Sequence, residues 1–389
     1  MKTKFLLLSL IGSFLVNAQT LNFQNLTDMP TARGASASAI VDTDMYVING
    51  YDANGDTSYI EKYSIPNNSW TTLNTVLLPK RFTSSEAYNN KIYVMNGWLN
   101  SNVEIFDPAT NTVTNGAPNP YYAGNAGSAV YNGKIYVFGG SGLNNTSTYT
   151  YTNKFQYYDI AANTWNTLPD MPVAKETKGK IVNDKLYVIG GFNGTNSNKI
   201  NVFNLTTNTW TDEYTMPVGV SGHSVAVQND KIFIVGDYDN QNFLAYFNTT
   251  NNQLYQLSSN MVPRRHSVAQ VYNNKLYLMG GSTTTVITSS LKSAQAADIS
   301  PNILSVKENK EQVFTIKGYP NPFTDHFVVS SSHDGPFDYI IFSPEGRQVS
   351  RGSASFNKAI DLSTLEKGNY IFSFKNGKGL LEQFNIIKK

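Results

Sequence analysis

Lys134-Ile-Tyr-Val-Phe-Gly-Gly140 is one copy of a pattern that occurs six times between residues 45 and 281. Each copy is a short apolar run that contains an aromatic residue and ends on a glycine pair or a close substitute. The other copies are Met45-Tyr-Val-Ile-Asn-Gly50, Lys91-Ile-Tyr-Val-Met-Asn-Gly97, Lys185-Leu-Tyr-Val-Ile-Gly-Gly191, Lys231-Ile-Phe-Ile-Val-Gly-Asp237 and Lys275-Leu-Tyr-Leu-Met-Gly-Gly281. Their last residues are 47, 43, 51, 46 and 44 positions apart, so the middle of the chain is an internal repeat.

Three further features recur between these copies. An aromatic strand such as Tyr158-Asp159 follows the glycines, and the repeat ends on Met-Pro or an equivalent. A tryptophan stands between them at Trp70, Trp165 and Trp210. Each copy thus has four short runs rich in β-branched and aromatic residues, separated by Gly, Asn and Pro, which predicts four strands. One such sheet cannot bury both of its faces, so the copies are expected to stack.

The glycine pair, the Tyr-Asp, the tryptophan and the Met-Pro together resemble the kelch repeat over roughly residues 20–292. Kelch repeats form β-propellers with one four-stranded blade per repeat. The resemblance therefore implies an all-β fold with six blades. We expect each tryptophan to fill the gap between neighbouring blades, where its burial contributes about 2–3 kcal/mol.

The N-terminal residues are expected to complete the sixth blade. Phe23 lies seven residues before Pro30, just as Trp165 lies seven residues before Pro172. Phe23 thus has the position of a fourth strand, whereas the sixth copy has three strands and then loses the pattern. Joining the two ends would remove exposed sheet edges. We predict that residues 19–292 form a six-bladed kelch-type β-propeller closed by its N-terminal strand.

Residues 1–18 have the pattern of a secretory signal peptide. Lys2 and Lys4 precede an apolar stretch from Phe5 to Val16, and Ala18 supplies a small residue at the cleavage site. The stretch is shorter than the roughly 20 apolar residues that a bilayer span requires. We therefore predict cleavage rather than a retained anchor, and no later segment has the length and hydrophobicity of a transmembrane segment.

The composition changes after residue 292. Residues 293–312 contain Ser-Ala-Gln-Ala-Ala-Asp followed by a run of charges, and they are predicted to be a linker. Residues 313–389 carry alternating strand patterns punctuated by glycines. This pattern suggests a small Ig-like antiparallel β-sandwich.

The tail also carries recognisable motifs. Tyr319-Pro-Asn-Pro-Phe323, Phe342-Ser-Pro-Glu-Gly346, Asp361-Leu-Ser-Thr-Leu-Glu-Lys-Gly-Asn-Tyr370 and Phe384-Asn-Ile-Ile-Lys-Lys389 resemble the C-terminal sorting domain of the bacterial type IX secretion system. The resemblance implies that residues 313–389 engage the type IX machinery. It also implies export across the outer membrane, with the protein secreted or held at the cell surface. The alternative is an ordinary C-terminal binding sandwich.

Composition excludes several functions. The 30 basic and 28 acidic residues give a net charge of +2, which argues against nucleic acid as a partner. The absence of cysteine excludes disulfides, thiolate catalysis and cysteine–metal sites. The acidic runs that begin at Asp52 and Asp237 lack the glutamate that ends a calcium-binding loop. No metal and no cofactor is therefore predicted.

Basic residues recur just before the first strand of several copies. They are Arg33, Lys80, Arg81, Lys175, Arg264 and Arg265, with His223 and His266 close by. If these side chains converge near a central channel, their positive potential would favour an anionic ligand. The alternative is that they are solvated loop charges and histidines packed between blades.

A second set of candidates follows the glycine pairs. Tyr51, Trp98, Phe192 and Tyr238 occupy this place in four copies, and Ser141 and Ser282 occupy it in the other two. Aromatic rings on these loops could stack on the faces of sugar rings. The alternative is packing against an adjacent blade. Trp98 is the best candidate, because it does not stand at the structural tryptophan position of the repeat.

These features favour an exported propeller that binds a glycan or an extracellular protein through one loop face, with no catalytic residue. The alternative is a carbohydrate-active enzyme that resembles the sialic-acid mutarotases. In that enzyme Glu86 or Glu176, on predicted first strands, would move a proton beside Arg81 or Lys175. A third alternative is an adhesion component in which the propeller is a spacer.

Overall fold

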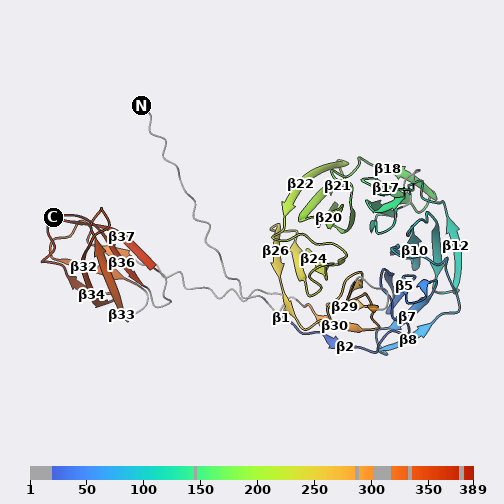
Figure 1. Cartoon of the computed structure of the whole chain (residues 1–389), viewed down its shortest axis with the longest axis horizontal. Helices are drawn as coiled ribbons and strands as arrows, with labels where there is room; N and C mark the ends of the chain where they lie inside the picture. The colour runs from blue at the N-terminus through green and yellow to red at the C-terminus, as the bar shows by residue number, and fades with distance from the viewer. Residues whose placement is uncertain are drawn as a thin grey trace. The chain divides into compact units, whose positions relative to one another are not determined.

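A computed structural model of the chain describes residues 20–121, 123–143, 147–284, 289–300, 317–331, 335–375 and 381–389 (Figure 1). The chain divides into two compact units, Met1–Leu304 (unit 1) and Ser305–Lys389 (unit 2). Strands joined by turns make up nearly all of the described part, and no helix in that part could cross a membrane. The predicted signal peptide, residues 1–18, lies outside the described residues.

Described residues 20–300 contain six four-stranded sheets, in which each strand is antiparallel to its neighbours. Sheet 1 comprises β3 (Ala37–Val41), β4 (Asp44–Ile48), β7 (Ile60–Ser64) and β8 (Ser69–Thr72). Sheet 2 comprises β9 (Ser84–Tyr88), β10 (Lys91–Met95), β11 (Val103–Asp107) and β12 (Thr112–Gly116). Sheet 3 comprises β13 (Gly127–Tyr131), β14 (Lys134–Phe138), β17 (Phe155–Asp159) and β18 (Thr164–Thr167).

The second half of the unit repeats this organisation. Sheet 4 comprises β19 (Glu176–Val182), β20 (Lys185–Phe192), β21 (Lys199–Asn204) and β22 (Thr209–Thr215). Sheet 5 comprises β23 (Ser224–Gln228), β24 (Lys231–Val235), β25 (Leu244–Asn248) and β26 (Gln253–Gln256). Sheet 6 comprises β28 (Val268–Tyr272), β29 (Lys275–Met279), β30 (Ala294–Asp298) and β2 (Gln24–Asn25).

The first strands of these sheets follow one another in contact. β3 touches β9, β9 touches β13, β13 touches β19, β19 touches β23, β23 touches β28, and β28 touches β3. Figure 1 shows the sheets of unit 1 in this order around a ring. Apolar side chains fill the space between neighbouring sheets, as where Phe155 of sheet 3 meets Phe203 of sheet 4 with ring centroids 4.8 Å apart. Burial between sheets thus explains why a single copy is not a stable unit.

The tryptophans of the repeat, in sheets 1, 3 and 4, connect these sheets to the segment before them. Nε1 of Trp70 donates a hydrogen bond to the Thr27 carbonyl at 2.8 Å, and Nε1 of Trp165 donates to the Ala117 carbonyl at 2.9 Å. The Trp70 ring also packs on Tyr63, with centroids 5.0 Å apart. The predicted position of these rings between copies is confirmed.

The N-terminal residues join sheet 6 as its fourth strand. β2 is antiparallel to β30, with Gln24 opposite Ala296 and Asn25 opposite Gln295. Just before β2 in the chain, β1 (Thr20–Leu21) runs parallel to β27 (Ser258–Ser259), which follows the last strand of sheet 5. Residues far apart in the chain are thus hydrogen-bonded side by side, at the place that the spacing of Phe23 predicted.

The predicted boundary between the repeats and the linker at residue 292 is wrong. Residues 294–298, which the composition suggested were linker, form β30, the third strand of sheet 6. Ala294, Ala296 and Ala297 are buried there. Small side chains suit a strand in close contact with its neighbours, but they lack the β-branched and aromatic signal from which a strand is predicted. Residues 301–316 lie outside the described part of the chain.

The glycine pairs are required where the loops come close together. Gly191 has φ of 114°, and a Cβ there would lie 2.1 Å from the carbonyl oxygen of Glu176. In two copies the first glycine is replaced by Asn49 or Asn96, with φ of 55° and 56°. Asparagine tolerates this left-handed conformation better than most residues. Two short hairpins, β5 (Tyr51–Asp52) with β6 (Gly55–Asp56) and β15 (Ser141–Leu143) with β16 (Tyr149–Tyr151), extend the loops after the pairs.

The described residues of unit 2 form two antiparallel sheets. One is built from β31 (Lys317–Tyr319), β32 (His326–Ser330) and β35 (Ala359–Asp361). The other has the order β34 (Gln348–Ser355), β33 (Pro336–Phe342), β36 (Gly368–Lys375) and β37 (Leu381–Lys388). Phe327 of the first sheet packs on Phe372 of the second, with ring centroids 5.3 Å apart, so both sheets share one apolar core.

Replacing Phe23 by alanine tests how much the N-terminal segment stabilises unit 1. Phe23 is only 3% exposed, and truncating a buried aromatic side chain costs about 3–5 kcal/mol. We expect Phe23→Ala to lower the free energy of unfolding by about 3 kcal/mol or more, measured by urea denaturation. The exposed Val76 provides the control, since Val76→Ala should change stability by less than about 0.5 kcal/mol. Equal effects of the two variants would contradict the packing described here.

Candidate functional site

The two ends of the sheets differ in polarity. Segments that join strand two to three, and strand four to the next strand one, lie at one end of each sheet, here called the loop face. Every large apolar side chain that is exposed among described residues 20–300 belongs to these segments: Tyr59, Val76, Leu78, Leu99, Tyr121, Tyr149, Val173, Val218 and Tyr238. The turns at the opposite end carry mainly Asn, Asp, Thr and Gly. The loop face is therefore the end suited to bind a partner.

A belt of backbone hydrogen bonds links the copies where the chain enters the first strands. Its members have a left-handed backbone with φ between 48° and 59°, and they are Ala35, Phe82, Asn125, Gly222 and His266. Phe82 N–H donates to Ala35, Asn125 N–H to Phe82, His266 N–H to Gly222, and Ala35 N–H to His266, at 2.6–2.9 Å. These hydrogen bonds hold the segments that enter the first strands of neighbouring copies next to one another on the loop face.

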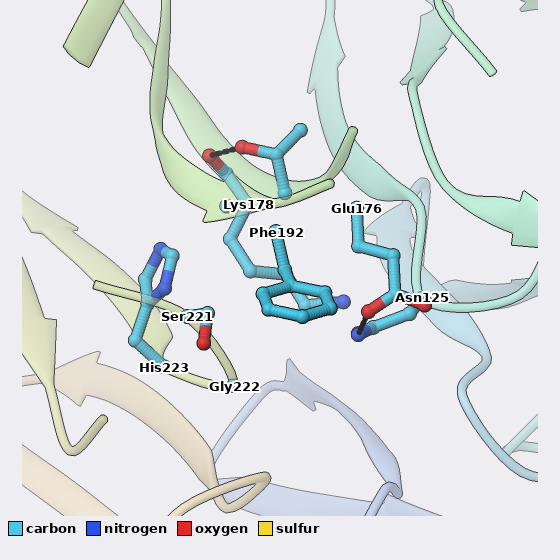
Figure 2. Close-up of a pocket in the computed structure, with 9 residues that line it drawn as sticks. Asn125, Glu176, Lys178, Phe192, Ser221, Gly222 and His223 are labelled. Carbon is cyan, nitrogen blue, oxygen red and sulfur yellow. Dashed lines mark hydrogen bonds between the residues drawn. The ribbon is translucent and has the colours of Figure 1, made fainter. Parts of the chain in front are cut away.

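The belt is interrupted at sheet 4. Glu176 pairs with Phe192 at the end of β20, as Gly34 pairs with Tyr51 and Arg265 with Ser282, so it stands one position before the belt residues of those copies. The stretch from Glu176 to Lys178 is one residue shorter than the matching stretch of those copies, and it has no residue in the left-handed conformation. Within this described region no backbone hydrogen bond joins Glu176 to Asn125 or to Gly222. A small hollow, partly open to solvent and with room for about one water molecule, lies at the interruption. Figure 2 shows its lining, which includes Asn125, Glu176, Lys178, Phe192, Ser221 and His223.

Three hydrogen bonds fix the Glu176 carboxylate. The Asn125 amide donates to Oε2 at 2.7 Å, and the Tyr149 hydroxyl donates to Oε1 at 2.5 Å. The Ser141 hydroxyl also donates to Oε1. Burial, followed by the bond to Glu176, raises the pKa of Tyr149, so this phenol stays protonated and remains a donor. The carboxylate is therefore held in one position at the edge of the hollow.

The basic groups of the hollow have lowered pKa values. Burial lowers the pKa of Lys178 to about 8, against the opposing effect of Glu176. Its Nζ donates to the Ala126 carbonyl at 3.1 Å. In Figure 2 the Lys178 side chain extends past the Phe192 ring toward the side where Glu176 lies. Burial also lowers the pKa of His223 to about 3, so this imidazole is neutral at physiological pH.

An aromatic ladder leads away from the hollow across sheets 4, 3, 2 and 1. Phe192 contacts Tyr151 at 6.0 Å between centroids, and Tyr151 contacts Tyr149 at 5.3 Å. Tyr149 in turn stacks on Trp98 at 5.5 Å. The Arg81 guanidinium then lies 6.0 Å from the Trp98 ring and 4.6 Å from the Tyr51 ring. These five rings and one cation form a continuous surface.

A second group of predicted residues gathers on sheets 5 and 6. The Arg265 guanidinium lies 4.0 Å from the Tyr238 ring centroid. Tyr238 contacts His266 at 6.2 Å, and His266 contacts Phe82 at 5.3 Å. Burial lowers the pKa of His266 to about 3, with Arg265 as the next cause. The loop face thus brings together Tyr51, Arg81, Trp98, Glu176, Phe192, Tyr238, Arg265 and His266 from the predicted set.

Arg33, Lys80, Lys175 and Arg264 take a different place, buried against the third strand of the sheet that follows them. Arg33 pairs with Glu61 at 2.7 Å, and Lys80 pairs with Glu104 at 2.8 Å. Lys175 donates to Asn201 at 3.1 Å, and Arg264 donates to Gln295 at 2.9 Å. Burial lowers the pKa of each of these basic groups, to about 8 for Lys175 and about 10 for Arg264.

The partners of these cations stand at matching positions of the third strands. Sheet 3 has a neutral pair in their place, in which Gln156 donates to Asn119. Sheet 5 has Val220 and Ala245, both buried in one apolar cluster. In each copy, the residue before the first strand and its partner on the third strand are therefore either both polar or both apolar. Because a buried charge is stable only with a partner, we assign Arg33, Lys175 and Arg264 to packing and not, as the sequence suggested, to ligand binding.

The remaining candidates also have internal partners. Glu86 in β9 accepts a hydrogen bond from the Ser128 hydroxyl at 2.7 Å, and its Oε1 lies 3.5 Å from Nζ of Lys180. The cation beside Glu86 is therefore Lys180, and not Arg81 or Lys175 as the enzyme alternative expected. Asp52 accepts from the backbone of its own turn at 2.7 Å, and Asp237 accepts from Ser221 N–H at 2.7 Å. These aspartates cap loops. No cluster of potential metal ligands is present in the described part of the chain.

Several residues of the hollow and ladder were not predicted from sequence. They are Asn125, Tyr149, Tyr151, Lys178 and Ser221. Tyr149 and Tyr151 belong to the longest interval between copies, 51 residues from Gly140 to Gly191. That added length was a usable signal, because an insertion in one copy of a repeat maps to a loop, often on the binding face.

Two parts of the chain match known protein families. Residues 102–237 and 180–331 match the KLHDC2/KLHL20/DRC7 Kelch-repeats domain, and residues 32–76 match the Kelch motif. Residues 317–388 match the Secretion system C-terminal sorting domain. The chain belongs to the kelch-repeat proteins and ends in a type IX sorting domain, which directs secretion across the outer membrane to the cell surface.

Curated relatives share the repeats at low identity. Kelch-like protein terF of Aspergillus terreus (strain NIH 2624 / FGSC A1156) is 27% identical over 286 residues, covering 65% of this chain and 62% of that protein. Kelch repeat and BTB domain-containing protein 12 of Homo sapiens is 27% identical over 180 residues, covering 40% and 29%. Beta-scruin of Limulus polyphemus is 27% identical over 161 residues, covering 38% and 17%. The chain spans less than two thirds of the length of these relatives.

The pairing of Lys80 with Glu104 can be tested against the apolar pair of sheet 5. Removing one partner of a buried ion pair costs about 3–5 kcal/mol, whereas replacing both by apolar residues is often neutral. We expect Lys80→Val and Glu104→Ala each to destabilise unit 1 by about 3 kcal/mol or more, and the double variant to cost about 1 kcal/mol or less. Urea denaturation of all four proteins measures the coupling. Additive effects would show that the two side chains act independently.

Proposed function

We propose that unit 1 is an extracellular binding module, a closed six-bladed propeller that binds a glycan or a protein through its loop face. The observation that carries this proposal is the aromatic ladder with Arg81, which lies at the end of the sheets where the exposed apolar side chains gather. The sorting domain supports an extracellular site of action.

Two observations support the closed six-bladed arrangement. The first strand of sheet 6 touches the first strand of sheet 1, and β2 supplies the fourth strand of sheet 6. Closure in this way pairs the edge of β30 with β2, so that sheet 6 has four strands like the other sheets of the array. It also keeps the loop segments of all copies on one side, which a binding face assembled from several copies requires.

The ladder favours a glycan as the partner. Its rings are large, partly exposed and arranged in series, and aromatic faces pack well on the C–H faces of sugars. A protein partner is the second candidate, because aliphatic side chains are exposed at the rim of the same face. These are Leu78, Leu99, Val173 and Val218. Protein interfaces bury such residues at their core.

Trp98→Ala tests the binding proposal. We expect the wild-type chain to bind in a glycan array or to capture an extracellular protein, and the variant to lose at least tenfold in affinity, because stacking on the ring is lost. Lys275→Ala is the control, since Lys275 is exposed at the opposite end of sheet 6. Blank results in both assays for the wild-type protein would contradict the proposal.

A sugar mutarotase is the alternative function, and one arrangement favours it. Glu176 lies beside Lys178, whose pKa is lowered to about 8. Opening a sugar ring needs a base at the anomeric hydroxyl and an acid at the ring oxygen. A carboxylate and a readily deprotonated ammonium could fill these two roles.

Anomer exchange detected by NMR separates this alternative from binding alone. If unit 1 is a mutarotase, it should accelerate exchange, and Glu176→Gln should remove the acceleration. Glu86→Gln should retain it, because Glu86 does not line the hollow. Exchange at the uncatalysed rate with wild-type protein would exclude the enzyme for the sugars tested.

A further inference from the structure

The four-stranded sheet of unit 2 has one covered edge and one free edge. Strand β37 lies at the covered edge, where residues 321–323 run alongside it. Phe323 N–H donates to the Ile387 carbonyl at 2.8 Å. Asn321 contributes two more bonds, since its side-chain oxygen accepts from Ile387 N–H at 2.9 Å and its amide donates to the Asn385 carbonyl at 2.6 Å. The backbone of β37 therefore has partners on both sides here.

Strand β34 lies at the opposite edge and has a partner on one side. It pairs with β33 along its whole length. Within the described residues, no strand, bridge or loop backbone is hydrogen-bonded to the outer side of residues 348–354. Such a row of unpaired N–H and C=O groups is a template for an added strand, and proteins often shorten or cover it. With 8 residues, β34 is longer than the average strand of about five or six, so it offers a long template.

The side chains of β34 leave this backbone open to a partner. Its sequence is Gln-Val-Ser-Arg-Gly-Ser-Ala-Ser, in which five residues are Ser, Gly or Ala. Gly352 is fixed by packing, because a Cβ there would lie 2.8 Å from the Tyr339 hydroxyl. The Ser353 hydroxyl donates to Asp338 on β33, so it lies toward the sheet. Small side chains of this kind allow close approach of a second backbone.

Three cations stand along the free edge. Arg351 lies within β34, Arg347 directly precedes the strand, and Lys358 follows the turn after it. All three are exposed. Within the described residues of unit 2, Lys388 forms an ion pair with Asp325, whereas these three cations form none. The edge thus combines unpaired backbone groups with unpaired positive charge.

From this combination we infer that the free edge of β34 is a docking surface of the sorting domain, and that it receives an acidic extended segment of the type IX export machinery as an added strand. The match to the sorting domain spans residues 317–388 and includes all of β34. Because this domain directs secretion, part of its surface has to contact the machinery. The inference concerns unit 2 and goes beyond the binding function proposed for unit 1.

Strand addition divides recognition between backbone and side chains. Main-chain hydrogen bonds supply affinity, and side chains at alternate positions supply specificity. Since side chains alternate between the two faces of a strand, acids at every second position of the added segment lie on one face. On β34 that face is the one where Arg351 is exposed. Arg347 and Lys358 extend the positive charge to both ends of the strand.

The same charges argue against a second copy of the chain as the occupant. In an antiparallel pair of two β34 strands, the cations of one copy would face the cations of the other, and like charges on neighbouring strands repel. An acidic strand meets the opposite sign instead. The three cations therefore act against self-association and in favour of an acidic partner.

Hydrogen exchange of the full chain with short peptides tests the pairing. The probe is an alternating Glu-Val octapeptide with blocked ends, and a Lys-Val octapeptide of the same length is the charge control. An acidic octapeptide that is N-methylated at every residue keeps the charge but donates no main-chain hydrogen bond. We expect the Glu-Val peptide to slow exchange of the amides of residues 348–354 about fivefold or more. The two control peptides should leave this exchange unchanged.

Variants connect this edge to export. Combining Arg347→Glu, Arg351→Glu and Lys358→Glu should weaken binding of the Glu-Val peptide about tenfold or more. In a bacterium with a type IX system, the same variant should reach the cell surface in an amount at least fivefold lower and accumulate in the periplasm. Lys317→Glu is the matched control and should change neither result, because Lys317 is exposed on β31 at the far edge of the other sheet.

A milder variant keeps the test decisive if the triple variant does not fold, which thermal unfolding measures. Arg351→Gln removes one charge and preserves the length of the side chain, and it should weaken peptide binding about threefold. Wild-type export of the folded triple variant would overturn the inference. So would unchanged exchange in residues 348–354 with the Glu-Val peptide, or equal protection by the N-methylated peptide. None of these results bears on the binding function proposed for unit 1.

Discussion

The pairing of β2 with β30 is the interaction on which the arrangement of unit 1 depends. It places the first described residues beside the last strand of the repeat array, where Gln24 and Asn25 face Ala296 and Gln295. The sheets on either side of this seam, 6 and 1, touch through β28 and β3. Each sheet buries its faces only against its neighbours. The pairing of β2 with β30 therefore also stabilises sheets that these two strands do not contact.

Charged residues have two distinct uses in this molecule. Arg33 and Lys80 are buried and paired, and they hold the linker between copies against the following sheet. Arg81, the next residue after Lys80, lies instead on the loop face between Tyr51 and Trp98. Adjacent basic residues therefore serve packing and surface chemistry respectively. Both residues have an acidic partner, but the Lys80–Glu104 pair is buried, whereas the Arg81–Asp56 pair at 2.9 Å is partly exposed.

Departure from regularity marks the candidate site. Belt residues with a left-handed backbone link five copies. The copy that contains Glu176 breaks the series, because its first strand is one residue shorter at this point and has no left-handed residue. The preceding copy, that of sheet 3, carries the β15–β16 hairpin, which supplies Tyr149 and Tyr151. A repeat array offers many equivalent positions, and a ligand site needs a position that differs from the rest. Here the hollow lies where the belt member is missing, and the longer loop of the preceding copy supplies Tyr149 and Tyr151 of the ladder.

The repeat spacing, the glycine pairs and the place of Phe23 sufficed to predict the four-stranded copies and the position of the N-terminal strand, because strand periodicity and turn chemistry are local. Motif residues likewise identified the sorting domain. Local signals failed at β30, whose alanines resemble a linker. They also could not separate the fully buried Arg33 from Arg81, which is half-buried on the loop face. Which cation finds a buried partner, and which loops meet around Glu176, depends on contacts between copies about 45 residues apart. Only the tertiary structure decides those contacts, since burial and pairing are properties of neighbours in space.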